Sequence, residues 1–219
     1  MLGTLNMTEL ILIRHGETSW NRERRMQGQL NTPLSDLGLA QAEATGVRLA
    51  SHAFTALYSS DLKRAHDTAS AISRASGKQI VTDIALRERA FGIFEGLTAD
   101  DISSKYPVEN ERFVARDPEY VIPGGESARG FYERALGCME RIAERHRGEC
   151  VVVVTHGLVL DTMYRAARNM PIEPKREAPL YNASLNTFRR KADGWIEVMW
   201  GDVAHLAEVG VTDYRGRAA

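Results

Sequence analysis

Two short apolar runs, each closed by a histidine and a glycine, constrain the fold of this chain more than any other feature. The run LILI leads through one arginine to His15-Gly16, and the run VVVV leads through one threonine to His156-Gly157. A short apolar run stopped by a turn residue is typical of a strand that is buried on both faces, as in a parallel sheet. We therefore expect two buried strands, each with a histidine at its carboxyl end.

Helical spacing of apolar residues separates and flanks these strands. We expect one helix after Ser35, a second from Asp61 to Gly77, and a third across residues 127–146. In the first helix the inward-facing residues are expected to be Leu37, Gln41, Ala44 and Val47, with Leu34 and Leu39 as a hydrophobic staple around the cap. Helices and strands therefore alternate over most of the chain.

Further strand-like stretches complete the pattern. They are residues 56–59, residues 79–86 as a strand or extended edge, and residues 184–191 and 195–200, which flank an Ala-Asp-Gly turn. Alternation of this kind predicts an α/β fold, a three-layer sandwich with a mostly parallel central sheet and helices on both faces.

The length of 219 residues suits one domain with a single core. We expect residues 1–219 to form that domain. Residues from about 92 to 125 show weak periodicity and contain three prolines, Pro107, Pro118 and Pro123. This segment is expected to be a lid-like insertion that covers the domain.

Composition excludes several classes of partner. The 28 basic and 29 acidic side chains nearly balance, so no global field attracts nucleic acid or an anionic membrane. No stretch approaches the ~20 apolar residues of a membrane span, and the first ten residues do not resemble a secretion signal. Cys138 and Cys150 are expected to be buried, reduced thiols. We expect a cytoplasmic protein without nucleic-acid or membrane partners.

Cationic and imidazole groups are expected to gather at one edge of the sheet. Ligands of open α/β sheets bind beyond the carboxyl ends of the strands. Arg14, His15 and His156 end two predicted strands, and Arg64 lies in the first turn of the helix that follows a third. Three distant segments thus deliver these four side chains to one crevice.

These residue types suit the chemistry of a phosphomonoester. The planar fork of an arginine gives bidentate bonds to phosphate, which makes Arg14 and Arg64 candidate phosphate ligands. A neutral imidazole can attack phosphorus through one ring nitrogen while the other is held by a hydrogen bond. His15 is the candidate for attack, and His156 the candidate donor to a phosphoryl oxygen.

Two further elements are needed around the phosphorus atom. Expulsion of an alkoxide requires a proton donor, and Glu88, in the segment LRERAFG, is the candidate if its surroundings raise its pKa. The backbone N–H groups of Gly16, Glu17 and Thr18 are expected to form a nest for the anion. A local anion site is therefore expected despite the balanced net charge.

Several blocks of sequence carry a resemblance to a known family. LIRHGETSWN at 12–21 resembles the signature of the histidine phosphatase superfamily, the phosphoglycerate mutase-like proteins. Further blocks resemble those of the family in the same order, namely SSDLKRAHDTA at 59–69, LRERAFGIFEG at 86–96, PGGES at 123–127, VVVTHG at 152–157 and NASL at 182–185. The resemblance covers nearly the whole chain.

The resemblance implies a role for each matching residue. His15 corresponds to the phosphohistidine nucleophile, and Glu88 to the group that gives and takes a proton. Arg14, Arg64 and His156 correspond to the residues that hold the phosphoryl group. Accessory substrate-binding positions are implied at Thr18, Asn21, Gln27, Gly28 and Gly157. The family needs no metal, and no metal-ligand motif is present to suggest one.

Within this family the chain resembles the broad phosphatase branch. Residues 97–122 are short and carry more acidic than basic side chains, whereas the resemblance to glycolytic mutases predicts a longer, basic insertion. The expected function is hydrolysis of small phosphomonoesters without a cofactor. The first alternative is a phosphoglycerate mutase, which would use 2,3-bisphosphoglycerate. The second is a non-catalytic module that binds phospho-ligands, although His15 and Glu88 are both present. A monomer and a homodimer remain equally open.

Overall fold

A six-stranded mixed sheet forms the centre of the protein, which is seen here in a computed structural model that describes residues 7–173, 175 and 178–213. The strand order is β3-β2-β4-β1-β5-β6. The strands are β1 (Thr8–Arg14), β2 (Ala56–Ser59), β3 (Ile80–Thr82), β4 (Cys150–Thr155), β5 (Leu185–Lys191) and β6 (Gly194–Asp202). The first four in this order are parallel, whereas β5 is antiparallel both to β1 and to β6.

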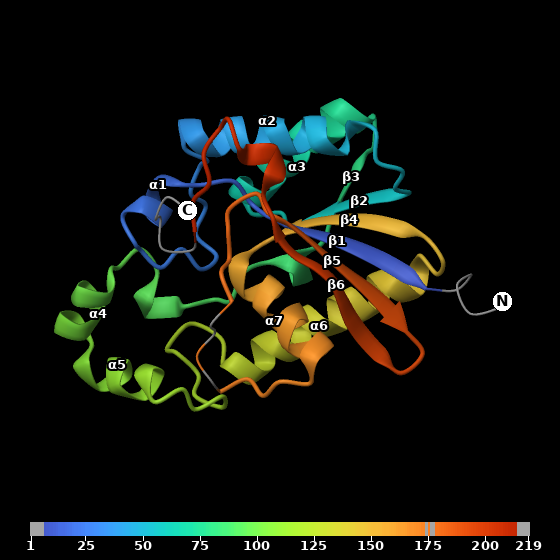
Figure 1. Cartoon of the computed structure of the whole chain (residues 1–219). Helices are drawn as coiled ribbons and strands as arrows, with labels where there is room; N and C mark the ends of the chain where they lie inside the picture. Colours follow the sequence, from blue (N-terminus) through green and yellow to red (C-terminus); the bar gives the residue numbers. More distant parts are fainter. Residues whose placement is uncertain (1–6, 174, 176–177, 214–219) are drawn as a thin grey trace.

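Helices cover both faces of this sheet. They are α1 (Ser19–Arg22), α2 (Asp36–Ala50), α3 (Lys63–Ser76), α4 (Ala99–Lys105), α5 (Pro107–Val114), α6 (Ala128–Arg145) and α7 (Gly157–Arg168). Short 3₁₀ turns lie at η1 (Ile84–Leu86), η2 (Gly92–Phe94) and η3 (Ala204–Leu206). The helices α2 and α3 lie on one face and α6 and α7 on the other (Figure 1). The predicted three-layer α/β fold is confirmed.

The continuous apolar run of β1 follows from burial on both faces. Leu10 and Leu12 belong to the core under α6 and α7, whereas Ile11 and Ile13 belong to the core under α2 and α3. All four side chains are at most 3% exposed. Side chains of a strand alternate between faces, so a strand with a layer on each side needs an apolar residue at every position.

The predicted buried face of α2 is only partly correct: Gln41 is buried, and Ser35 caps the helix as expected, its Oγ accepting from the Gly38 N–H at 3.0 Å. Val47 is 75% exposed and Leu39 is 50% exposed, so neither packs inward. The buried face instead carries small residues at close backbone contacts. A Cβ at Gly46 would lie 2.8 Å from the Ala71 carbonyl oxygen of α3. Because α2 and α3 approach closely, this face of α2 needs small side chains. Large apolar residues therefore do not mark it in the sequence.

The other local predictions agree with the structure at two helix boundaries and differ from it at two elements. Helix α3 ends at Gly77 in the left-handed conformation, with φ of 72°, and α6 begins after its cap Ser127. Residues 79–86 form only the short strand β3 and then a 3₁₀ turn. Helix α7, which starts directly after His156, was not predicted.

Residues 92–125 contain two short helices and most of a small apolar cluster. The cluster is centred on Phe91, Phe94, Ile102 and Ile122. The helices α4 and α5 have 7 and 8 residues, too few turns to show a clear period, and Pro107 occupies the first position of α5. Figure 1 shows both helices away from the sheet, on the side where the carboxyl ends of the parallel strands lie.

Two remaining expectations concern environment. Among residues 7–173, 175 and 178–213, no helix combines the length and apolar character that crossing a membrane requires. Cys138 is buried and Cys150 is only half-buried, and neither thiol is in a disulfide. The expectation of two buried thiols is therefore correct for Cys138 alone.

Candidate active site

His15 follows the last residue of β1 and is 3% exposed. Its backbone N–H continues the sheet ladder to the Thr155 carbonyl oxygen at 3.0 Å. Its ring Nδ1 lies 2.7 Å from the Gly16 carbonyl oxygen. Because a carbonyl only accepts, Nδ1 carries the proton and Nε2 presents its lone pair. Burial, with the charges of Arg64 and Arg14, holds the pKa of His15 well below its usual value, so the ring stays neutral.

His156 follows β4 in the same way and faces His15, with 5.3 Å between the ring centroids. Its Nε2 lies 2.8 Å from the Ser60 Oγ. That Oγ also accepts from the Leu62 N–H at 3.3 Å, and among the described residues its buried hydroxyl proton has no other acceptor than the imidazole, so the hydroxyl donates to Nε2. His156 is therefore protonated on Nδ1, a buried atom without a hydrogen-bond partner among the described residues. It is a donor that a phosphoryl oxygen can use.

Arg14 and Arg64 bring two buried guanidinium groups to the same place, 2% and 1% exposed. Arg14 donates to the Leu180 carbonyl oxygen at 2.7 Å. Arg64 donates to the carbonyl oxygens of Leu30 at 2.8 Å and Gly28 at 2.7 Å. Burial lowers the pKa of Arg64 to about 10, which still leaves it charged at neutral pH. These carbonyl oxygens hold both guanidinium groups in place, so two cationic groups are fixed at the site.

Glu88 is the acidic group of the site and is 8% exposed. Its two carboxylate oxygens accept from the backbone N–H groups of Arg89 at 2.8 Å and Leu158 at 3.1 Å. Burial raises its pKa, while these two bonds and the charges of Arg64 and Arg14 oppose the rise. The charges of Arg64 and Arg14 act on the pKa values of His15, His156 and Glu88, and the two rings face each other, so the five side chains lie close together.

The predicted backbone nest at residues 16–18 is wrong. The Gly16 N–H donates to Thr68 Oγ1 at 3.0 Å, the Glu17 N–H to Gln41 Oε1 at 2.9 Å, and the Thr18 N–H to Asn21 Oδ1 at 3.0 Å. All three amides are therefore occupied by side chains from α2, α3 and α1. Because this loop is buried, its amides need hydrogen-bond acceptors within the protein, and side chains of the neighbouring helices supply them. The donors for an anion are side chains instead.

The accessory positions implied by the resemblance lie around this loop. Thr18 and Asn21 form a capping box at α1, and the Gln27 side-chain oxygen accepts from Thr32 Oγ1 at 2.8 Å. Gly28 offers its carbonyl to Arg64, and Gly157 is the buried first residue of α7. The hydrogen bonds of Thr18, Gln27 and Gly28 are thus made within the protein, and these residues position the loops beside His15 and Arg64.

Two polar residues of the site were not predicted. Ser60 fixes the tautomer of His156, and Asn182 donates from Nδ2 to the His15 carbonyl oxygen at 3.0 Å. Both are fully buried. Ser60 stands just beyond the carboxyl end of β2, where the topology already placed ligands, and that position was a usable signal.

The arrangement suits transfer of a phosphoryl group. The neutral imidazole of His15, with its lone pair available, suits a nucleophile. The carboxyl group of Glu88, with its raised pKa, suits an acid. Two fixed guanidinium groups and an imidazole N–H supply charge for the equatorial oxygens of the transition state.

Comparison with known proteins agrees with this geometry. A family model for the histidine phosphatase superfamily (branch 1) matches residues 10–203. The chain therefore belongs to this superfamily of histidine-dependent phosphotransfer enzymes, and the predicted family is confirmed.

Individual relatives include both phosphatase and mutase-like proteins. The chain is 42% identical over 210 residues to phosphoglycerate mutase-like protein 4 of Arabidopsis thaliana, which covers 94% of this chain and 90% of that protein. It is 40% identical over 207 residues to the metal-independent phosphoserine phosphatase of the same plant, covering 93% and 85%. The solved structure of YhfR from Bacillus stearothermophilus superposes with a TM-score of 0.84 at 36% identity, covering 91% and 99%.

Proposed function

We propose that this enzyme is a metal-independent phosphatase of small phosphorylated metabolites that works through a phosphohistidine at His15. The observation that supports this most directly is the hydrogen bond from His15 Nδ1 to the Gly16 carbonyl oxygen, because it leaves Nε2 as a neutral nucleophile. The similarity to the Arabidopsis phosphoserine phosphatase favours a small phosphomonoester as substrate and a reaction without metal.

In the first step, His15 Nε2 attacks phosphorus and the bond from phosphorus to the leaving oxygen breaks. Glu88 gives its proton to that oxygen, so an alcohol departs instead of an alkoxide. Arg14, Arg64 and the Nδ1–H of His156 hold the three equatorial oxygens as charge spreads over them. The raised pKa of Glu88 favours the protonated form that this step needs.

In the second step, water attacks the phosphohistidine. The Glu88 carboxylate takes one proton from the water, the nitrogen–phosphorus bond breaks, and inorganic phosphate leaves. His15 returns to its neutral form and Glu88 to its protonated form, so atoms and charges balance over the cycle. The accessory positions Thr18, Asn21, Gln27, Gly28 and Gly157 would shape the rim that receives the rest of the substrate, and residues 92–125 would cover it.

A phosphoglycerate mutase is the second candidate, supported by the similarity to the mutase-like Arabidopsis protein. It shares every catalytic residue and differs in whether the phosphohistidine returns its phosphate to an organic acceptor or to water. Retention of the phosphoenzyme requires exclusion of water. The 7- and 8-residue helices of the insertion form a small cover, which favours hydrolysis.

The test is an assay of purified protein in the presence of a chelator. Phosphate release is followed from phosphoserine, phosphoglycerates and sugar phosphates, and interconversion of 3- and 2-phosphoglycerate is followed with added 2,3-bisphosphoglycerate. Phosphate release without interconversion is expected. Rapid interconversion with little release would establish the mutase, and loss of all activity in chelator would remove the metal-independent mechanism.

A further inference from the structure

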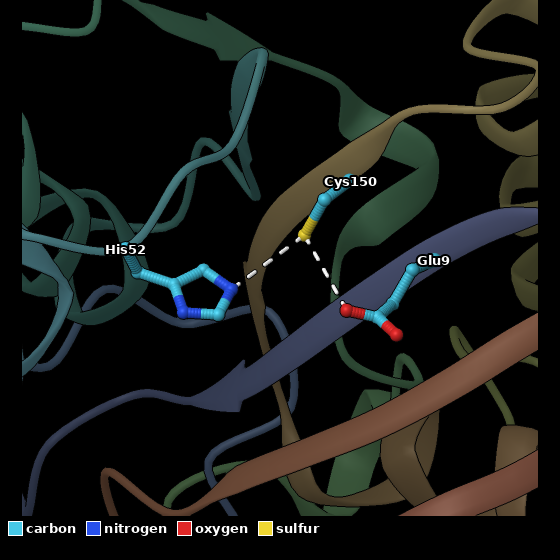
Figure 2. A group of neighbouring side chains, drawn as sticks. All are labelled: Glu9, His52 and Cys150. Carbon is cyan, nitrogen blue, oxygen red and sulfur yellow. Dashed lines mark hydrogen bonds between the residues drawn. The ribbon is translucent and has the colours of Figure 1, made fainter.

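Three side chains with metal-binding atoms meet at the amino ends of the central strands. Glu9 of β1 and Cys150 of β4 are partners in the parallel ladder, so their side chains project from the same face of the sheet. His52 lies just after α2, where its backbone N–H donates to the Leu49 carbonyl oxygen at 3.0 Å. Figure 2 shows the carboxylate, the imidazole and the thiol directed toward one another.

The distances between their donor atoms are close to those of a metal centre. Cys150 Sγ lies 3.7 Å from Glu9 Oε1 and 3.9 Å from His52 Nε2, and the three atoms all lie within 4.8 Å of one another. Tetrahedral zinc, with bonds of about 2.3 Å to sulfur and about 2.0 Å to nitrogen and oxygen, separates its ligand atoms by roughly 3.5 Å. Small side-chain movements would therefore complete the geometry.

We propose that Glu9, His52 and Cys150 form a zinc site, with water as the fourth ligand. Thiolate, imidazole and carboxylate are the donor set that zinc takes in proteins. Cys150 binds as a thiolate, and its proton goes to solvent. Because the bound form is the thiolate, zinc binding and proton release are coupled.

A neighbouring cavity gives an ion access to the site, and a neighbouring arginine orients the Glu9 carboxylate. A cavity of about 330 Å³, lined by Glu9, Cys150, Gly148 and Arg189 among others, opens beside the thiol. Arg189 Nε donates to Glu9 Oε2 at 2.8 Å, which leaves Oε1 turned toward Cys150. An outer partner of this kind orients a metal-binding carboxylate.

This site is separate from the candidate active site. Glu9 and His15 are six positions apart along extended chain, which corresponds to about 20 Å. A bound ion would join the loop after α2 to two central strands. It would stabilise the folded protein by RT ln(1 + c/Kd), where c is the zinc concentration and Kd its dissociation constant, without entering the phosphotransfer reaction.

The experiment uses Co²⁺ as a spectroscopic probe and Zn²⁺ as its competitor on the chelator-treated, full-length protein. A thiolate bound to Co²⁺ gives a charge-transfer band in the near ultraviolet. The active-site histidines supply no thiolate, so the band reports on a cysteine. We expect one Co²⁺ per chain, a band that Zn²⁺ abolishes, and a rise in melting temperature with Zn²⁺.

Variants identify the ligands. Cys150→Ser should remove the band, and His52→Gln, at an exposed position after α2, should weaken zinc affinity at least about tenfold. Cys138→Ser is the matched control, because this other thiol lies buried on α6 and should leave the band and the affinity unchanged. No saturable band in the unmodified protein, or equal zinc affinity in the protein and in His52→Gln, would overturn the proposal.

Discussion

The two strand–histidine–glycine turns share a sequence pattern and differ in what the chain does next. After β1, Gly16 leads into a buried loop, and its carbonyl holds Nδ1 of His15. After β4, Gly157 begins helix α7, and the hydroxyl of Ser60 on a neighbouring segment holds Nε2 of His156. Opposite nitrogens are therefore occupied. One ring keeps a lone pair on Nε2 for attack, and the other keeps an N–H on Nδ1 for donation.

The comparison shows that the tautomer of each histidine ring determines whether it can act as nucleophile or as hydrogen-bond donor. Both rings are buried and both have a pKa well below the usual value for histidine, chiefly because of desolvation. Electrostatics alone thus treats the two rings alike. The hydrogen-bond partner of each ring, a carbonyl in one case and a hydroxyl in the other, makes one a nucleophile and the other a donor.

The largest expected effect separates the two histidines directly. His15→Ala should lower phosphatase turnover by about 10⁴-fold or more and abolish the phosphoenzyme, because no other lone pair is positioned on phosphorus. His156→Ala should lower kcat/KM by about 10²–10³-fold through loss of one donor, while a phosphoenzyme still forms. Acid quench with radiolabelled substrate measures both. A phosphoenzyme in His15→Ala would reverse the assignment.

The next largest effect concerns Glu88, whose carboxylate accepts from the Leu158 N–H of α7. Glu88→Gln should lower kcat by about 10²–10⁴-fold for substrates with poor leaving groups. In the unmodified enzyme, activity should fall as pH rises through the raised pKa of Glu88, because the proton donor is lost. A pH–rate profile of both proteins is the measurement. Persistence of the alkaline limb in Glu88→Gln would show that another group supplies the proton.

Burial of two neutral imidazoles should also make stability depend on pH. The unfolded chain takes up a proton on each ring near pH 6.5, whereas the folded chain does so only at lower pH. The free energy of unfolding should therefore fall as pH decreases below about 6.5, by up to ~1.4 kcal/mol per pH unit for each ring. Urea titrations at several pH values measure the slope.

A variant isolates this contribution from that of Glu88, whose raised pKa acts in the opposite sense. His156→Gln removes one buried ring. It should reduce the dependence of the unfolding free energy on pH by the contribution of that ring. An identical slope in the variant would mean that folding does not lower the pKa of His156.

The smallest effect tests the tautomer itself. Ser60→Ala removes the bond to His156 Nε2 and should lower kcat/KM about fivefold, the equivalent of a hydrogen bond worth ~1 kcal/mol. Nitrogen NMR of the imidazole should show loss of the single Nδ1–H tautomer. Ser59→Ala is the matched control, because the Ser59 hydroxyl donates to the Ser60 carbonyl oxygen, and among the hydrogen bonds of the described residues none joins it to His156. Equal effects of both variants would contradict the assignment.

Local sequence determined most elements of this protein. Continuous apolar runs placed β1 and β4, turn residues closed α3 at Gly77 and started α6 after Ser127, and the hairpin was expected at its turn. The residues that meet at the site were also predicted from strand ends and from family motifs. These features depend on neighbours in the sequence or on one rule of sheet topology, so they can be inferred without coordinates.

Tertiary structure decided the rest, because the deciding partners are remote in sequence. Gln41 and Thr68 took the amides expected to bind an anion, and contact with Ala71 at Gly46 set the buried face of α2. The tautomer of His156 depends on Ser60, 96 residues away. The meeting of Glu9 with Cys150 depends on a strand register between segments 141 residues apart. Sequence specifies which side chains reach the edge of a sheet, whereas the assembled fold specifies which hydrogen bonds they make there.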